Sequence, residues 1–112
     1  MMFTGIIIRT SGLMEKISFH DFSTYMNREL AGNFECVSLP DISMTLWLND
    51  SGKLDGLFPN AIASLLFSQY IGNDILIGNV LCLGDIDENT GDVLSLTSSQ
   101  VDFFYNQASF NF

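Results

Sequence analysis

Three oxygen-bearing side chains alternate along one acidic loop of the sequence. Asp85, Asp87 and Asn89 have the spacing of the first three ligands of a calcium-binding loop. The rest of that pattern is missing, because Thr90 stands where the sharp-turn glycine belongs and Leu96 where the bidentate acid belongs. A solvated turn is therefore the favoured interpretation, and a calcium site at the three residues is the alternative.

Nucleophilic and acid–base chemistry has still fewer candidates. His20 is the single histidine, and no neighbouring serine or cysteine forms a recognisable nucleophile–base pair with it. The sequence has no Gly-x-Ser-x-Gly elbow, no phosphate-binding glycine loop and no cysteine–histidine cluster for zinc. We therefore expect a surface histidine, no catalytic residues, no cofactor and no enzymatic activity.

The segment from Asn49 to Asn60 is the most promising candidate for binding. It joins an expected strand to an expected helix, and the N-terminus of a helix presents free N–H groups that can receive a ligand. A long structural loop whose asparagines cap its own turns is the favoured alternative. The candidate ligand- or partner-binding residues are Asn49, Asp50, Gly56, Pro59, Asn60 and Gly78.

The elements that must position these residues follow from hydrophobic periodicity and turn residues. Strands are expected at 3–9, 13–17, 33–39, 43–49 and 75–83. Helices are expected from Ser18 to Gly32, from Asn60 to Tyr70 and from Thr97 onward. Ser18 is the expected first N-cap, with Asp21 at the third helical position, and Thr97 with Gln100 forms a capping box.

This order of elements predicts a single α+β domain over residues 1–112. We expect a small antiparallel or mixed sheet of about five strands with two to three helices, in which an N-terminal β-hairpin precedes the first helix. The tail 103–112 is expected to be frayed or to pack on a partner, because its rings exceed what one helical stripe can bury. The rings offered as a homodimer or partner interface are Phe103, Phe104, Tyr105, Phe110 and Phe112.

Charge limits the possible partners. The net charge is −9, and no Lys or Arg follows Lys53. Phosphate backbones and anionic membranes are held by cationic side chains, so we expect no direct nucleic-acid or membrane binding. The acidity suits a basic partner protein or a cation, and an acidic protein can also imitate DNA.

The two cysteines, Cys36 and Cys82, each lie in an apolar, strand-like stretch. Two cysteines do not make a disulfide framework, so we expect free buried thiols in a reducing compartment.

Several segments together resemble a small family that is known mainly from phages and mobile elements, the domain of unknown function 3846. The resemblance lies in residues 48–54 (Leu-Asn-Asp-Ser-Gly-Lys-Leu), 56–61 (Gly-Leu-Phe-Pro-Asn-Ala) and 72–80 (Gly-Asn-Asp-Ile-Leu-Ile-Gly-Asn-Val), with the turn at 39–41 and the helix start at 96–97. It extends from the N-terminal hairpin to about Val101. The Phe-rich tail and the sparse charge depart from the pattern.

The resemblance implies a setting and no reaction. It implies an accessory protein in the cytoplasm of a bacterial host, where small phage proteins often act by stoichiometric binding. We expect a non-enzymatic protein that binds and modulates or inhibits a host protein, possible roles being counter-defence and homodimerisation. The alternatives are a small-molecule or nucleotide-signal sponge and an acidic DNA-mimic inhibitor.

Overall fold

The computed structural model describes residues 2–51 and 56–111, with the side chains of the last helix up to Asn106. Five strands form one antiparallel sheet: β1 (Phe3–Ile8), β2 (Met14–Phe19), β3 (Phe34–Leu39), β4 (Met44–Asn49) and β5 (Val80–Gly84). The α-helices are α1 (Phe22–Leu30), α2 (Ala61–Leu66), α3 (Ser68–Ile71) and α4 (Ser98–Asn111), and a 3₁₀ turn at Pro40–Ile42 joins β3 to β4. The expected α+β class and the N-terminal hairpin followed by a helix are confirmed.

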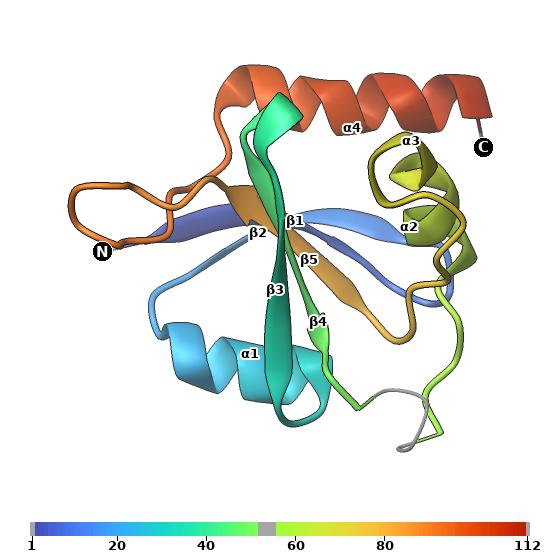
Figure 1. Ribbon diagram of the computed structural model, residues 1–112, viewed down its shortest axis with the longest axis horizontal. Helices are drawn as coiled ribbons and strands as arrows, with labels where there is room; N and C mark the ends of the chain where they lie inside the picture. Colours follow the sequence, from blue (N-terminus) through green and yellow to red (C-terminus); the bar gives the residue numbers. More distant parts are fainter. Residues whose placement is uncertain (1, 52–55, 112) are drawn as a thin grey trace.

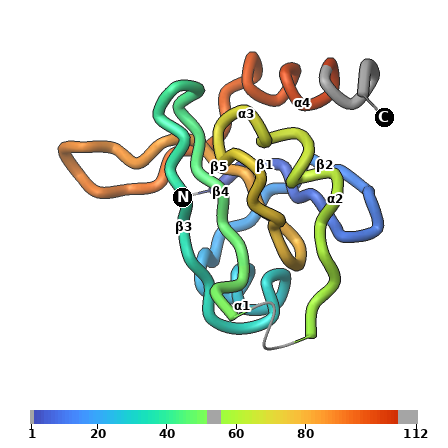
Figure 2. The backbone as a smooth tube through the Cα atoms, turned by 45° about the vertical axis from the view of Figure 1, so that its right-hand side comes forward, coloured from blue at the N-terminus to red at the C-terminus, as the bar shows by residue number. Residues whose placement is uncertain are grey.

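The sheet lies between two helical layers (Figure 1). Its strand order is β2-β1-β5-β4-β3, which places β5 at the centre and leaves β2 and β3 as the two edges. Helix α1 covers one face, and α2, α3 and α4 cover the other (Figures 1 and 2). Every residue of β5 is buried, as expected for a central strand that packs against helices on both faces. None of the helices among the described residues has the length and apolarity that a membrane crossing requires.

Alternate side chains of the strands point into two separate hydrophobic cores, one on each face of the sheet. The α1 face is aromatic: the Phe19 ring stacks on Tyr25 with a centroid distance of 4.1 Å, and Phe22 meets the edge of Trp47 at 5.1 Å. The opposite core is larger and mainly aliphatic, with Phe67 and Phe104 at its centre. A sheet buried on both faces explains how a short chain buries so many apolar side chains.

The first helix begins three residues later than the sequence suggested. Ser18 remains in β2, paired with Thr4, because the next residue, Phe19, is buried against the rings of the α1 face. Asp21 is the N-cap instead, and its carboxylate accepts a hydrogen bond from the Thr24 N–H at 3.0 Å. The predicted cap at Ser18 was therefore wrong, since burial of Phe19 extends the strand.

The predicted strand 75–83 was wrong in its first half, because β5 begins only at Val80. The preceding segment bonds to the chain around Asn60 instead of to the sheet: the Asn60 N–H donates to Leu76 O at 2.8 Å and the Gly78 N–H donates to Phe58 O at 2.7 Å. Gly78 has a φ of +81°, which turns the chain into β5. The predicted second helix also divides at Phe67 into α2 and α3, so the described residues contain four α-helices where two to three were expected.

Helix α4 begins with the predicted capping box. The Thr97 N–H donates to Gln100 Oε1 at 2.9 Å, and the Gln100 N–H donates to Thr97 Oγ1 at 3.2 Å. Gln100 Nε2 also donates to the carbonyls of Ile42 and Ser43, so the same residue joins α4 to the turn between β3 and β4.

The rings of α4 do not share one environment. Phe104 is fully buried and meets Phe67 with a centroid distance of 6.0 Å, so the interface role expected for Phe104 gives way to a place in the core. Phe103 is half-buried against the same core, and Tyr105 is exposed. Phe110 and Phe112 lie outside the described side chains.

Phe104→Ala should lower the free energy of unfolding by about 3–5 kcal/mol, because it removes a fully buried ring and leaves a cavity beside Phe67. Phe103→Ala, on the same helix and half-buried, should cost clearly less. Urea denaturation followed by circular dichroism measures both. Equal losses would contradict the placement of Phe104 at the centre of the core.

Candidate functional site

Asn49 ends β4 and caps the end of helix α1. Its Nδ2 donates to Leu30 O at 2.9 Å and to Ala31 O at 3.1 Å, and its Oδ1 accepts from the Ser51 N–H at 2.7 Å. Ala31 has a left-handed φ of 61°, which a non-glycine residue adopts only where its surroundings hold it. The Asn49 amide is therefore committed to the fold.

Asn60 caps the start of helix α2 and is fully buried. Its Oδ1 accepts from the Ala63 N–H at 3.0 Å, and its Nδ2 donates to Ile8 O at 2.8 Å and to Gly78 O at 3.0 Å. Every polar atom of the side chain is thus used inside the protein. For Asn49 and Asn60, the structural interpretation of the loop holds.

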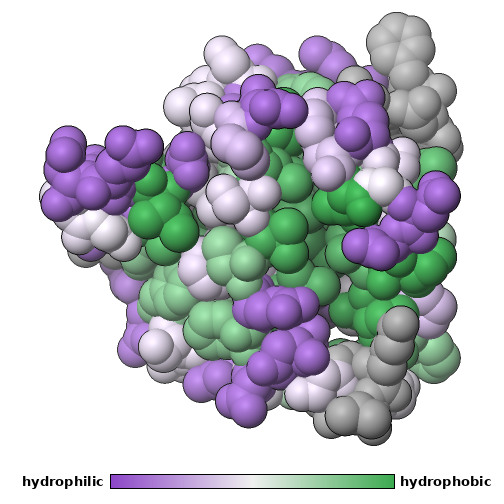
Figure 3. Space-filling model, in the orientation of Figure 1, coloured by the Kyte–Doolittle hydropathy of each residue, from purple (hydrophilic) through white to green (hydrophobic). Residues whose placement is uncertain are grey.

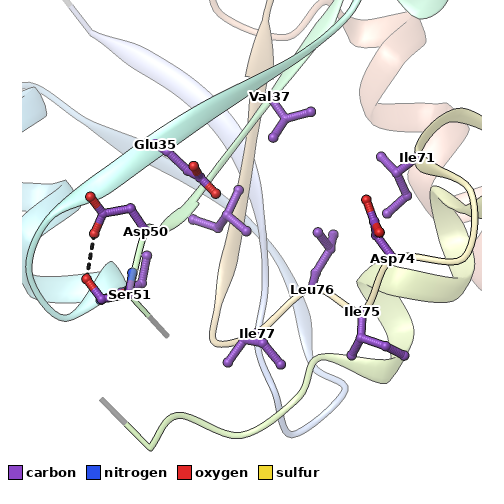
Figure 4. A pocket seen from close by; sticks show the side chains of 11 residues that line it. Glu35, Val37, Asp50, Ser51, Ile71, Asp74, Ile75, Leu76 and Ile77 are labelled. Atoms are coloured by element: carbon purple, nitrogen blue, oxygen red, sulfur yellow. Dashed lines mark hydrogen bonds between the residues drawn. The ribbon is translucent and has the colours of Figure 1, made fainter. Parts of the chain in front are cut away.

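An open groove lies beside this connection, between the β3–β4 face and the chain that follows α3. Its volume is about 390 Å³. Figure 4 shows Glu35 and Val37 of β3 on one side and Ile71 and Asp74 on the other, with Leu76 between them. The remaining lining residues are Leu48, Asn49, Asp50, Ser51, Ile75 and Ile77.

The groove combines an apolar floor with an acidic rim. Leu48 and Leu76 are buried at its base, whereas Ile75 is 60% exposed at its border. The carboxylates of Glu35, Asp50 and Asp74 are exposed around it, and the described lining includes no lysine or arginine. On one face of the molecule, apolar side chains gather into an area bordered by hydrophilic ones (Figure 3). The site therefore favours a ligand that is both apolar and cationic.

A second, smaller hollow of about 230 Å³ holds the two glycines of the predicted site, Gly56 and Gly78. The end of α1, including Glu29 and Ala31, forms another part of its wall. A helix C-terminus disfavours anions, and the Glu29 carboxylate here is paired with Arg9 at 2.9 Å. The six predicted residues are thus divided: Asn49 and Asp50 line the groove, Gly56 and Gly78 line the second hollow, and Pro59 and Asn60 are among the described lining residues of neither.

The acidic loop 85–92 forms a small hairpin that projects from the sheet (Figure 1), with Ile86 bridged to Val93. The Asp87 carboxylate accepts the N–H groups of Asn89 and Thr90 at 2.8 and 3.1 Å, and Asp85 accepts the N–H of Ile86. Among the described residues, no three or more His, Cys, Asp or Glu side chains cluster as a metal would require. These bonds favour the solvated turn over the calcium alternative.

His20 is exposed in the turn before α1, as predicted.

Cys82 is buried in the aliphatic core and Cys36 is exposed on edge strand β3, which corrects the expectation that both thiols are buried. They lie on opposite faces of the sheet, since Cys82 pairs with Leu46 and Cys36 pairs with Trp47. Partial burial of the sulfur, and then the Asp85 carboxylate, raise the pKa of Cys36. Burial raises the pKa of Cys82 as well.

The elements and both hollows described above fall within the span of a known family. The family model described as Domain of unknown function (DUF3846) matches residues 3–109. The chain belongs to this family. The resemblance noted at residues 48–54, 56–61 and 72–80 is thereby confirmed. Comparisons of this DUF3846 domain with curated proteins and with solved structures gave no match.

Of the residues that line the groove of this DUF3846 domain, sequence reasoning found Asn49 and Asp50 and missed both of the sides described above. Glu35, Val37 and the chain from Ile71 to Ile77 were not predicted as site residues. The available signal was a run of three apolar residues that follows Asp74 directly after a helix end. One residue of that run, Ile75, is exposed to solvent in the structure. That these residues face β3 depends on tertiary packing.

Asn60→Ala should destabilise the DUF3846 domain by about 3 kcal/mol, because α2 loses its cap and two buried carbonyls lose a donor. Asn73→Ala is the control, since Asn73 is exposed in the turn after α3 and its removal should change stability by less than about 0.5 kcal/mol. Chemical denaturation of both variants measures the difference. A loss below about 1 kcal/mol for Asn60→Ala would contradict the structural role.

Proposed function

We propose that this protein is a non-enzymatic accessory protein of a phage or mobile element that binds, and so modulates or inhibits, a host protein. The observation that carries the proposal is the groove between Glu35 and Asp74, with its apolar floor and acidic rim. The setting in the host cytoplasm rests on the family resemblance, and the mode of action rests on the groove.

The chemistry of the groove fits a partner segment that is rich in lysine or arginine. Such side chains can lay their aliphatic stems on Val37 and Ile75 while their charged ends meet the carboxylates of the rim. Exposed ion pairs each contribute about 0–1 kcal/mol, so apolar burial must supply most of the affinity. The carboxylates would speed encounter and select for a basic partner.

Two observations support binding over catalysis. The Cys36 thiol has a raised pKa, whereas a nucleophilic cysteine needs a lowered one. The side chains of Asn49 and Asn60, the polar groups of the loop best suited to hold a substrate, are used in hydrogen bonds of the fold. The groove is thus left with carboxylates and apolar groups, a set suited to recognition.

The charge of both hollows also weighs against the nucleotide-sponge alternative. Carboxylates border the groove, and the C-terminus of α1 borders the second hollow, where Glu29 is already paired with Arg9. A phosphate would need cations or free N–H groups at these places. Protein binding is therefore the function that the geometry favours.

Affinity capture from a host lysate, with quantitative mass spectrometry, tests this function. The double variant Glu35→Lys/Asp74→Lys reverses the charge of the groove, and we expect the protein captured by the wild type to be lost. The control, Glu88→Lys/Asp102→Lys, makes the same change of net charge at one exposed residue of the hairpin 85–92 and one of α4. This control variant should capture the same host protein as the wild type. Undiminished capture by the groove variant, or equal loss with the control, would contradict the proposal.

A further inference from the structure

We infer that the partner segment binds as an added β-strand along the outer edge of β3, with its basic side chains over the groove. This inference rests on the proposed function and specifies the backbone conformation and the chemical class of the partner. The edge of β3 and the groove are one continuous surface, because Glu35 and Val37 belong to both.

Successive residues of β3 alternate between those whose backbone groups bond to β4 and those whose groups point away from it, and only the second set is available to another strand. The Asp50 N–H donates to Asn33 O at 3.1 Å, which fixes the alternation of the β3–β4 ladder. Odd-numbered residues of β3 therefore bond to β4, and the N–H and C=O groups of Phe34, Cys36 and Ser38 face away from it. Since β3 ends the described sheet, these groups form an open edge on which another strand can pair.

An added strand would place alternate side chains directly over the groove. Glu35 and Val37 point to the face that bears the groove, whereas Phe34 packs on the α1 face. Side chains of paired strands that share a face are neighbours, with Cβ atoms about 5 Å apart. A lysine or arginine on the added strand would therefore lie beside Glu35, with Asp74 across the groove.

The other edge of the sheet lacks this combination. Strand β2 carries Glu15, whose carboxylate is paired with Arg9 at 2.9 Å, and the exposed Lys16, and an edge lysine discourages strand pairing. Strand β3 has no basic residue, and its one charge is the exposed Glu35. A basic partner is thus repelled at β2 and attracted at β3.

Charge also disfavours a second copy of this chain as the occupant of the β3 edge. Pairing of β3 with β3 would bring two Glu35 carboxylates to one small patch between two molecules, each with a net charge of −9. Like charges on neighbouring strands are destabilising. The partner segment is therefore a basic one.

A defined peptide can serve as the probe. We would add an acetylated, amidated heptapeptide of alternating lysine and valine to the ¹⁵N-labelled protein and follow amide exchange by NMR. Exchange should slow at Phe34, Cys36 and Ser38, and binding should weaken as salt is added. An otherwise identical peptide with N-methylated valines, and a glutamate–valine peptide, should each bind about tenfold or more weakly.

Two serines offer a matched pair of variants. Ser38 in β3 and Ser18 in β2 are both exposed, and the N–H of each faces away from the neighbouring strand. Proline removes an edge donor without breaking a ladder bond at either position. Ser38→Pro should lower the affinity for the lysine–valine peptide by about tenfold or more, whereas Ser18→Pro should leave that affinity unchanged. Thermal melts establish that both variants fold.

Several outcomes would overturn the inference. One is that the β3 amides gain no protection from exchange at millimolar peptide, and another is that the N-methylated or the acidic peptide binds as tightly as the lysine–valine peptide. A third is a concentration-dependent dimer in sedimentation experiments, with the β3 amides protected from exchange in that dimer. If the lysine–valine peptide does not bind, but Glu35→Lys/Asp74→Lys still abolishes capture of the host protein, the proposed function stands and only the added strand is wrong. If Ser38→Pro does not fold, the N-methylated peptide still decides the question on the wild type.

Discussion

The side-chain amide of Asn60 joins three parts of the chain that are far apart in sequence. It caps α2, and it donates to the end of β1 at Ile8 and to the turn before β5 at Gly78. Because Asn60 is fully buried, its own amide atoms must find their partners inside the protein, and these three bonds supply them. This one amide thus fixes where the helical layer meets the sheet.

The shape of the groove follows from that junction. The Asn60 N–H holds Leu76 O, and Ser64 relays the contact by accepting the Leu76 N–H and donating to Asn60 O. Leu76 is therefore turned into the core while its neighbour Ile75 remains in solvent. On the opposite side, Asn49 holds the end of α1, so the chain on both sides of the connection is kept in place by an asparagine. These two asparagines therefore hold the parts of the chain that border the groove.

Local signals in the sequence were enough for much of the fold. Thr97 and Gln100 are three residues apart, so their capping box could be recognised directly, and Asn60 was placed correctly at a helix start. The first helix was misplaced because a serine in a cap-like context is overruled when burial of Phe19 extends the strand. The segment before β5 has the composition of a strand, but its partner is the chain around Phe58 and Asn60.

The site was harder to predict, for a related reason. The bond from Asn60 to Ile8 and the placement of Glu35 and Asp74 on the two sides of one groove involve residues that are distant in sequence, and no local pattern encodes such an arrangement. Polar loop residues were therefore taken as candidates for binding when several of them serve the fold. The groove depends instead on apolar residues that tertiary packing leaves partly or largely exposed, such as the half-buried Val37 and the exposed Ile75.

We propose that the groove beside the Asn49–Asn60 connection, continuous with the edge of β3, is the functional surface of this protein. A structure of the complex with the captured host protein tests it most directly. We expect an extended segment of the partner along β3, with a lysine or arginine between Glu35 and Asp74. A partner bound at the hairpin 85–92 or on α4, with the groove left in solvent, would contradict the account.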